Sequence, residues 1–235
     1  MATFVIAECA STWRFGDDHL SNAYRLISAA KACAASALKV QWCSDPAAMA
    51  TRRHGKVEEV EFQILAYPFE WLLKLKAECD RVGIEFMCTV FIAKDIATIA
   101  PLVKRFKVAS AESSDAEFID AHAKFSKPLI ISNAFGSQAI RYEHMNLHCV
   151  CAYPTPIEQL NLSRIEMYEG NLIGLSDHTT SVLTGALAVA RGATVIEKHI
   201  RLEKTPNDNP DFEHSLVVDD FVCDLQGQWN CDGHN

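Results

Sequence analysis

The sequence contains no hydrophobic run long enough to cross a membrane, no cluster of basic residues and no Cys-x-x-Cys pair. A membrane-spanning helix needs ~18 or more consecutive apolar residues. The opening MATFVIAECAST also lacks the basic segment that precedes the apolar stretch of a secretory signal peptide. With scattered basic residues and a net charge of −8, the chain has no electrostatic footprint for nucleic acid. We therefore expect a cytoplasmic protein that binds neither membranes nor nucleic acid.

Internal repeats, linkers and low-complexity segments are absent as well. Apolar residues make up 49% of the chain and charged residues 22%, which is the balance of a folded globular protein rather than a disordered or collagen-like one. The composition does not shift along the chain. We therefore expect a single domain over residues 1–235, with a polar tail from about residue 226.

The nine cysteines are an odd number and do not suggest a disulfide framework. Several lie in or beside apolar, strand-like runs, namely Cys9, Cys43, Cys88, Cys149 and Cys151. This pattern is typical of reduced, buried thiols. Cys149 and Cys151 form a Cys-x-Cys pair, but one such pair without a second is weak evidence for zinc.

Short apolar segments alternate with amphipathic segments along the whole chain. Strands are predicted over 4–9, 37–42, 85–91, 105–110, 128–133, 145–151, 172–178 and 193–200, and helices over 19–34, 69–83, 96–103, 116–125, 157–170 and 181–192. Two connections are short, with only 137–144 and 217–230 as candidate helices. The alternation predicts an α/β fold, a trimmed (β/α)₈ TIM barrel, with an open doubly wound sheet as the alternative.

Polar residues concentrate where the predicted strands end, which is where barrel enzymes carry their reacting groups. Two of them, Lys39 and Lys107, are lysines inside apolar runs. An ammonium group in a barrel strand is costly without a counter-charge, so these lysines predict a bound anion. The alternative is that they pair with an internal carboxylate, and the candidates are Glu8, Glu112 and Glu197.

Two histidines, His178 and His199, end consecutive strands. Because adjacent strands lie about 4.8 Å apart, both imidazoles can reach one divalent ion. Asp177 and Glu197 would add ligands or orient the histidines. His148, inside the sixth strand, is better explained as a core histidine.

Several motifs resemble the N-acetylneuraminate (sialic acid) synthase family. The most specific are LHCVCAYPTPIEQLNL, GLSDHTTSVLTGALAVARGATVIEKHI and DNPDFEHSL, supported by FVIAE, ALKVQ, CTVF, FKVASAES and KPLIISNA in collinear order. The resemblance implies a barrel that condenses phosphoenolpyruvate with an N-acylated amino sugar, such as N-acetylmannosamine, to give a nine-carbon α-keto acid and phosphate. It also implies a divalent metal cofactor, Mn²⁺ or Mg²⁺.

The resemblance assigns roles residue by residue. The metal ligands fall on His178 and His199, and the catalytic carboxylate near the reacting carbons falls on Glu112. The sugar-side carboxylates fall on Glu8, also a catalytic candidate, and Asp211. The remaining substrate ligands fall on Lys39, Gln41, Thr89, Lys107, Ser110, Ser132, Tyr153 and Ser176.

Three departures from the family pattern affect the sugar side. CASTWRFGDD follows Glu8 where the family reads GINHNG, Cys151 stands where Asn is usual, and TPNDNPD replaces a shorter PGPD turn. We also expect the barrel domain alone, without the C-terminal antifreeze-like domain. The expected partner is a second copy in a homodimer, or a separate chain that supplies the missing lid domain. The alternatives to a sialic-acid-type synthase are a phosphoenolpyruvate enzyme with another aldehyde or sugar acceptor, and a non-catalytic barrel that retains the pocket.

Overall fold

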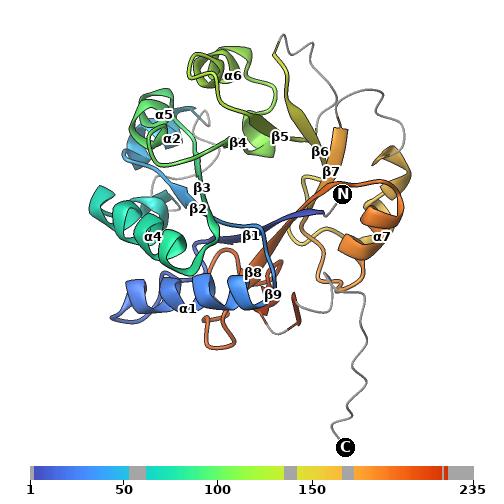
Figure 1. Ribbon diagram of the computed structural model, residues 1–235, viewed down its shortest axis with the longest axis horizontal. Helices are drawn as coiled ribbons and strands as arrows, with labels where there is room; N and C mark the ends of the chain where they lie inside the picture. Colours follow the sequence, from blue (N-terminus) through green and yellow to red (C-terminus); the bar gives the residue numbers. More distant parts are fainter. Residues whose placement is uncertain (1–2, 53–61, 135–141, 166–171, 219, 222–235) are drawn as a thin grey trace, which may run out of the picture.

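A closed ring of parallel strands forms the centre of the molecule, with helices around its outside (Figure 1). The computed structural model describes residues 3–52, 62–134, 142–165, 172–218 and 220–221. Each strand pairs with the next along the chain, and β1 pairs with β8 to close the ring. The strands are β1 (Phe4–Ala10), β2 (Ala37–Trp42), β3 (Glu85–Val90), β4 (Phe106–Val108), β5 (Leu129–Asn133), β6 (Met145–Cys149), β7 (Leu172–Asp177) and β8 (Val195–Arg201). The predicted (β/α)₈ barrel is confirmed.

The helices around the ring begin and end where local chemistry favours it. They are α1 (His19–Ala32), α2 (Pro46–Arg52), α4 (Phe69–Val82), α5 (Ala93–Ile99), α6 (Ala116–Ala123) and α7 (Thr184–Ala190). The carboxylate of Asp18 accepts a hydrogen bond from the Ser21 amide and caps α1, and α4 ends at Gly83, whose φ is 75°. No helix of the described residues has the length and apolar character needed to span a membrane.

Two predicted elements differ clearly from the observed ones within the described residues. Over 157–165, the described part of the helix expected over 157–170, the chain forms two 3₁₀ turns instead, η3 (Ile157–Gln159) and η4 (Leu162–Ile165). Asn161 between them has a φ of 46°, which lies outside the helical range. The fourth strand ends at Val108, and the 3₁₀ turn η2 (Ser110–Glu112) follows it. The segments 137–144 and 217–230 lie mostly outside the described residues, as does the polar tail. A short strand β9 (Leu216–Val217) pairs with β8.

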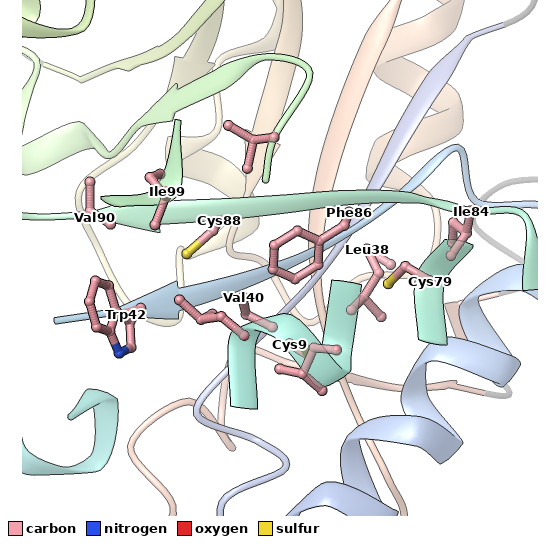
Figure 2. Packing of buried hydrophobic residues seen from close by; sticks show 14 of the residues in the cluster. Cys9, Leu38, Val40, Trp42, Cys79, Ile84, Phe86, Cys88, Val90 and Ile99 are labelled. Atoms are coloured by element: carbon pink, nitrogen blue, oxygen red, sulfur yellow. The ribbon is translucent and has the colours of Figure 1, made fainter. Parts of the chain in front are cut away.

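The main apolar core fills the layer between the strands and the surrounding helices. Figure 2 shows Leu38 and Val40 of β2 and Phe86 of β3 in this layer, beside Cys79 of α4. The described cysteines are all free thiols, and all are buried except Cys151. The expectation of buried thiols is therefore wrong for Cys151, because it lies beyond the end of β6 rather than within the strand.

The inside of the barrel is divided into an apolar layer and a polar layer. Side chains that point inward recur every second residue along a strand. The apolar layer consists of Ile6, Ala37, Met87, Ile130, Leu147 and Val195. Two residues further along five of these strands stand Glu8, Lys39, Thr89, Ser132 and Glu197, all buried. The strand period therefore brings the predicted polar groups together at one end of the barrel.

Gly174 of β7 lies where the apolar layer leaves no room for a side chain. A Cβ atom there would lie 2.1 Å from the Val195 carbonyl oxygen and 2.6 Å from Leu147 Cδ2. We expect Gly174→Ala to lower the free energy of unfolding by about 1–3 kcal/mol, because the strands would have to separate. Urea denaturation followed by circular dichroism measures this change. An unaltered transition midpoint would contradict the predicted clash.

Candidate active site

A cavity of about 440 Å³ opens at the carboxyl ends of the strands. All the predicted site residues line it except Thr89 and Glu112. The lining residues are Glu8, Lys39, Gln41, Phe62, Phe91, Lys107, Ala109, Ser110, Ala111, Ser132, Tyr153, Ser176, His178, Glu197, His199, Pro210, Asp211 and His214. Residues from strands far apart in the sequence thus converge on one polar chamber.

The two buried lysines share one carboxylate, Glu197. Lys107 Nζ lies 3.2 Å from Glu197 Oε1, and Lys39 Nζ lies 3.6 Å from Oε2. Lys107 also donates to Ser132 Oγ at 2.8 Å, and Ser176 Oγ donates to Glu197 Oε1 at 3.0 Å. The lysines therefore do pair with internal carboxylates, as the alternative interpretation expected, but they do so inside the chamber.

The buried charges perturb each other. Burial lowers the pKa of Lys39 to about 8. Burial alone would raise the pKa of Glu197, but the nearby ammonium groups of Lys107 and Lys39 outweigh burial and lower this pKa to about 2. The carboxylate is therefore ionised at neutral pH. With Glu8 included, the cluster holds two lysines and two carboxylates, and its formal charge is 2 − 2 = 0.

Three predicted residues have contacts that differ from their expected roles. Glu8 is fully buried, with Oε2 paired to Lys39 and Oε1 accepting from the Ala10 amide at 2.6 Å, so the protein engages both of its oxygens. Thr89 Oγ1 accepts from Lys39 at 3.1 Å and does not line the chamber. Glu112 is buried in η2 and is not among the lining residues.

The two predicted metal ligands, His178 and His199, face each other with ring centroids 5.2 Å apart. The ring of Tyr153 lies edge-on to His178 at 4.5 Å, and the Tyr153 hydroxyl is 3.0 Å from Ser110 Oγ. Burial and then the neighbouring His214 lower the pKa of His178 to about 3, and the same causes lower the pKa of His199. Both rings are therefore neutral at pH 7, the form that binds metals.

The donor set fits a divalent ion. His199 Nδ1 is buried and makes no hydrogen bond within the described residues. His199, Asp211 and His214 each offer a ligand atom, and these atoms lie within 4.8 Å of one another. His214 was not predicted from the sequence, because it lies in an irregular loop where no strand period fixes the direction of a side chain. Its spacing of three residues from Asp211 was the only available signal.

Asp177, considered as an additional metal ligand, points away from the chamber. Its Oδ2 lies 2.6 Å from Lys198 Nζ, and neither side chain is exposed to solvent. Asp177 Oδ1 accepts from the Thr179 amide at 2.8 Å. Because side chains alternate along a strand, Ser176 and His178 face inward while Asp177 between them faces outward. The same alternation on β8 separates Lys198 from Glu197 and His199.

The two loops that depart from the family pattern contact each other. Ser11 donates its amide to Asp211 Oδ2 at 2.9 Å, and its single hydroxyl hydrogen is shared between Asp211 Oδ2 and Asn209 Oδ1. The Asn209 amide returns a hydrogen bond to the Ser11 carbonyl at 3.0 Å. Arg14, the basic residue of the first loop, lies over the rings of Trp13, Tyr67 and Trp71 at 5.0–5.3 Å and does not line the chamber.

Comparison with known proteins places the chain in a family. The model of the NeuB family matches residues 26–223. The pseudaminic acid synthase of Campylobacter jejuni is 31% identical over 93% of this chain and 70% of its own length. The N,N'-diacetyllegionaminic acid synthase of Legionella pneumophila is 32% identical over 87% of this chain and 65% of its own length. The chain thus spans about two thirds of the length of these curated relatives.

A solved structure agrees with the sequence relatives. The sialic acid synthetase of Leptospira borgpetersenii, crystallised with citrate, superposes with a TM-score of 0.84 at 25% identity, covering 96% of this chain and 82% of that one. The resemblance to sialic acid synthases that the strand-end motifs indicated is confirmed, and the chain belongs to the NeuB family.

Proposed function

We propose that this chain condenses phosphoenolpyruvate with an N-acylated amino sugar, N-acetylmannosamine or a relative, in the cytoplasm. The products are a nine-carbon α-keto acid and phosphate. One observation carries the proposal: two buried lysines and several hydroxyls converge beside a pair of neutral histidines in one chamber. Its family membership supports the same class, since the relatives are named as synthases of pseudaminic and legionaminic acids.

The phosphoenolpyruvate end of the proposed site is built by Lys39, Lys107 and nearby hydroxyls. Ammonium and hydroxyl groups donate charge-assisted hydrogen bonds to phosphate and carboxylate oxygens. The hydroxyls of Ser132 and Ser176 contact the Lys107–Glu197 pair, and Ser110 lines the same wall. These groups lie on five different strands or turns, so the barrel frame fixes their spacing before the anion arrives.

The histidine end of the chamber receives the sugar carbonyl. When bound by His178 and His199, a divalent cation would add positive charge for the anion in a cluster of zero formal charge and would polarise the carbonyl that the enol carbon attacks. Glu197 lies beside both lysines and is ionised, and we propose that it orients their ammonium groups. The catalytic role of Glu112 at the reacting carbons stays a prediction.

Part of the chamber lining favours an acceptor that carries apolar groups and no phosphate. Phe62 and Phe91 line it together with Ala109 and Ala111, a surface suited to acyl or deoxy methyl groups. A phosphorylated sugar would need a basic group from the altered first loop. Arg14, the basic residue there, lies instead over three aromatic rings outside the chamber lining.

The test is release of phosphate from phosphoenolpyruvate by the purified chain with Mn²⁺ and a panel of acceptors. The panel contains N-acetylmannosamine, its 6-phosphate, a diacetylated 6-deoxy sugar and a different aldehyde, each with and without an added antifreeze-like domain. Acceptor-dependent release with an unphosphorylated amino sugar supports the proposal. Release with a different aldehyde supports the altered-acceptor alternative. If no phosphate is released and calorimetry detects no binding of phosphoenolpyruvate, the results support the alternative of a non-catalytic barrel.

The pKa of Lys39 predicts a pH limit for this reaction. Burial favours the neutral amine, and with a pKa of about 8 Lys39 loses its positive charge as the pH rises through that value. We therefore expect kcat/KM for phosphoenolpyruvate, which reports the free enzyme, to fall above pH 8. The fall should move to higher pH in Lys39→Arg, because guanidinium stays charged. A profile that is flat to pH 9.5 in the unaltered chain would contradict the prediction.

A further inference from the structure

A third histidine completes a cluster of metal-binding groups at the histidine end of the chamber. His214 lies in the loop after β8, and its ring centroid is 4.5 Å from that of His199 and 6.0 Å from that of His178. Its Nε2 atom lies 3.3 Å from Asp211 Oδ1. Ligand atoms of His199, Asp211 and His214 lie within 4.8 Å of one another, and the ring of His178 lies beside the two other histidine rings.

Hydrogen bonds hold the aspartate of this cluster in place. Ser11 donates both its amide and its hydroxyl to Asp211 Oδ2, and Asn209 Oδ1 accepts from the Asp211 amide at 3.0 Å. With Oδ2 engaged, Oδ1 is the oxygen that faces His214 and His199, at 3.3 and 3.9 Å. The two loops that depart from the family pattern therefore fix a carboxylate against two imidazoles, an arrangement that orients metal ligands.

The chemistry of the group points to a cation rather than to a simple ion pair. A simple pair between Asp211 and His214 would not involve His199. His199 Nδ1 is instead buried without a hydrogen bond, close to the same aspartate oxygen. A buried imidazole nitrogen without a partner costs free energy unless something accepts its lone pair or its proton. A metal ion between His199, Asp211 and His214 would do so.

We propose that His214 and Asp211 are protein ligands of the divalent ion that His178 and His199 hold. The inference rests on the proposed function for the presence of a metal, and it reassigns Asp211 from the sugar to the metal. A set of three imidazoles and one carboxylate favours first-row transition ions such as Mn²⁺, Co²⁺ or Zn²⁺ over Mg²⁺, which prefers oxygen ligands. It also allows the ion to bind before any substrate.

Metal binding without substrate tests the proposal. The chain is stripped with a chelator, and Mn²⁺ affinity is measured from the electron paramagnetic resonance signal of free Mn²⁺. We expect His214→Gln to weaken Mn²⁺ binding about tenfold or more. The matched control His144→Gln, before β6 at the opposite end of the barrel, should leave the affinity unchanged. An affinity of His214→Gln within twofold of the unaltered chain overturns the assignment.

A gain of signal guards against a variant that merely misfolds. In the Co²⁺-loaded protein, His214→Cys should add a sulfur-to-cobalt charge-transfer band that the unaltered chain and His144→Cys lack, because a thiolate at position 214 would bind the ion directly. Absence of the band in a folded, Co²⁺-loaded variant also overturns the assignment.

The assays separate this inference from the proposed function. If Mn²⁺ binding depends on His214 but no acceptor promotes phosphate release, the ligand assignment stands and the proposed reaction fails. If phosphate is released while Mn²⁺ affinity is the same with and without His214, the reaction stands and the ligand assignment fails.

Discussion

Lys107→Met is expected to lower kcat/KM for phosphoenolpyruvate by a factor of about 30 to several thousand. Lys107 is buried, and its ammonium group lies 3.2 Å from Glu197 and 2.8 Å from Ser132. Loss of one partner from a buried, hydrogen-bonded charge site costs about 2–5 kcal/mol, and each ~1.4 kcal/mol is tenfold in an equilibrium constant. Methionine fills the same volume, so the change removes the charge with little loss of packing.

The measurement combines initial rates of phosphate release with calorimetric binding of phosphoenolpyruvate. The matched control is Lys127→Met at the opposite end of the barrel, where Lys127 Nζ donates to the Val103 carbonyl. A thermal melt of each variant separates loss of binding from loss of folded protein. This control matters because Glu197 loses the nearer of its two lysine partners in the variant. A kcat/KM for Lys107→Met within threefold of the unaltered chain would remove Lys107 from the proposed site.

The strands could be predicted from the sequence because burial on both faces leaves a strong local signal. A run such as FVIAEC is apolar on each side, and the same pattern recurs in every strand of a parallel barrel. Helix 157–170 could not be predicted correctly, because its apolar spacing is helical while Asn161 adopts a left-handed conformation that only the fold selects. Helix α2 was missed although its start carries a signal, since Asp45 accepts from the Ala48 amide and Pro46 opens the helix.

The site residues that lie on strands could be predicted from the sequence. Period-two alternation places Lys39, Ser176 and His199 inside the barrel once the strand ends are known. Partners across the chamber were not predictable, because the sequence contains no distances: it could not decide which of three carboxylates pairs with each lysine. Loop residues were the hardest case. His214 lies three residues after Asp211, in a loop where Asp211 forms hydrogen bonds with Ser11 and Asn209.

The two loops that depart from the family pattern, one after Glu8 and one around Asp211, are best understood as a pair. Together they exchange hydrogen bonds between Ser11 and Asn209, and they bring Asp211 to the histidines. A change in one loop would leave buried polar groups of the other without partners, which is costly. With Asp211 as a metal ligand, as proposed above, this end of the chamber would have one more metal contact and one fewer sugar contact than the family motifs alone indicate.

Lys198→Met is expected to cause the largest loss of stability, about 3–5 kcal/mol in the free energy of unfolding. Lys198 and Asp177 are both fully buried, 2.6 Å apart, and Lys198 also donates to the Thr179 and Ser181 carbonyls at 2.8 and 3.1 Å. The substitution leaves the Asp177 carboxylate without its counter-ion in a dry environment. Since Asp177 and Lys198 directly precede His178 and His199 in the sequence, the pair also fixes the spacing of the strands that carry those histidines.

Urea denaturation at neutral pH measures the loss, and two further variants define its cause. The double variant Asp177→Asn with Lys198→Met should recover part of the stability, because no unpaired buried charge remains. Lys94→Met, which breaks an exposed ion pair with Asp45, should change stability little, because solvent screens that pair. If Lys198→Met is no less stable than Lys94→Met, the ion pair does not hold β7 to β8. If the single variant folds but binds Mn²⁺ more weakly, the pair positions the histidines as well as stabilising the barrel.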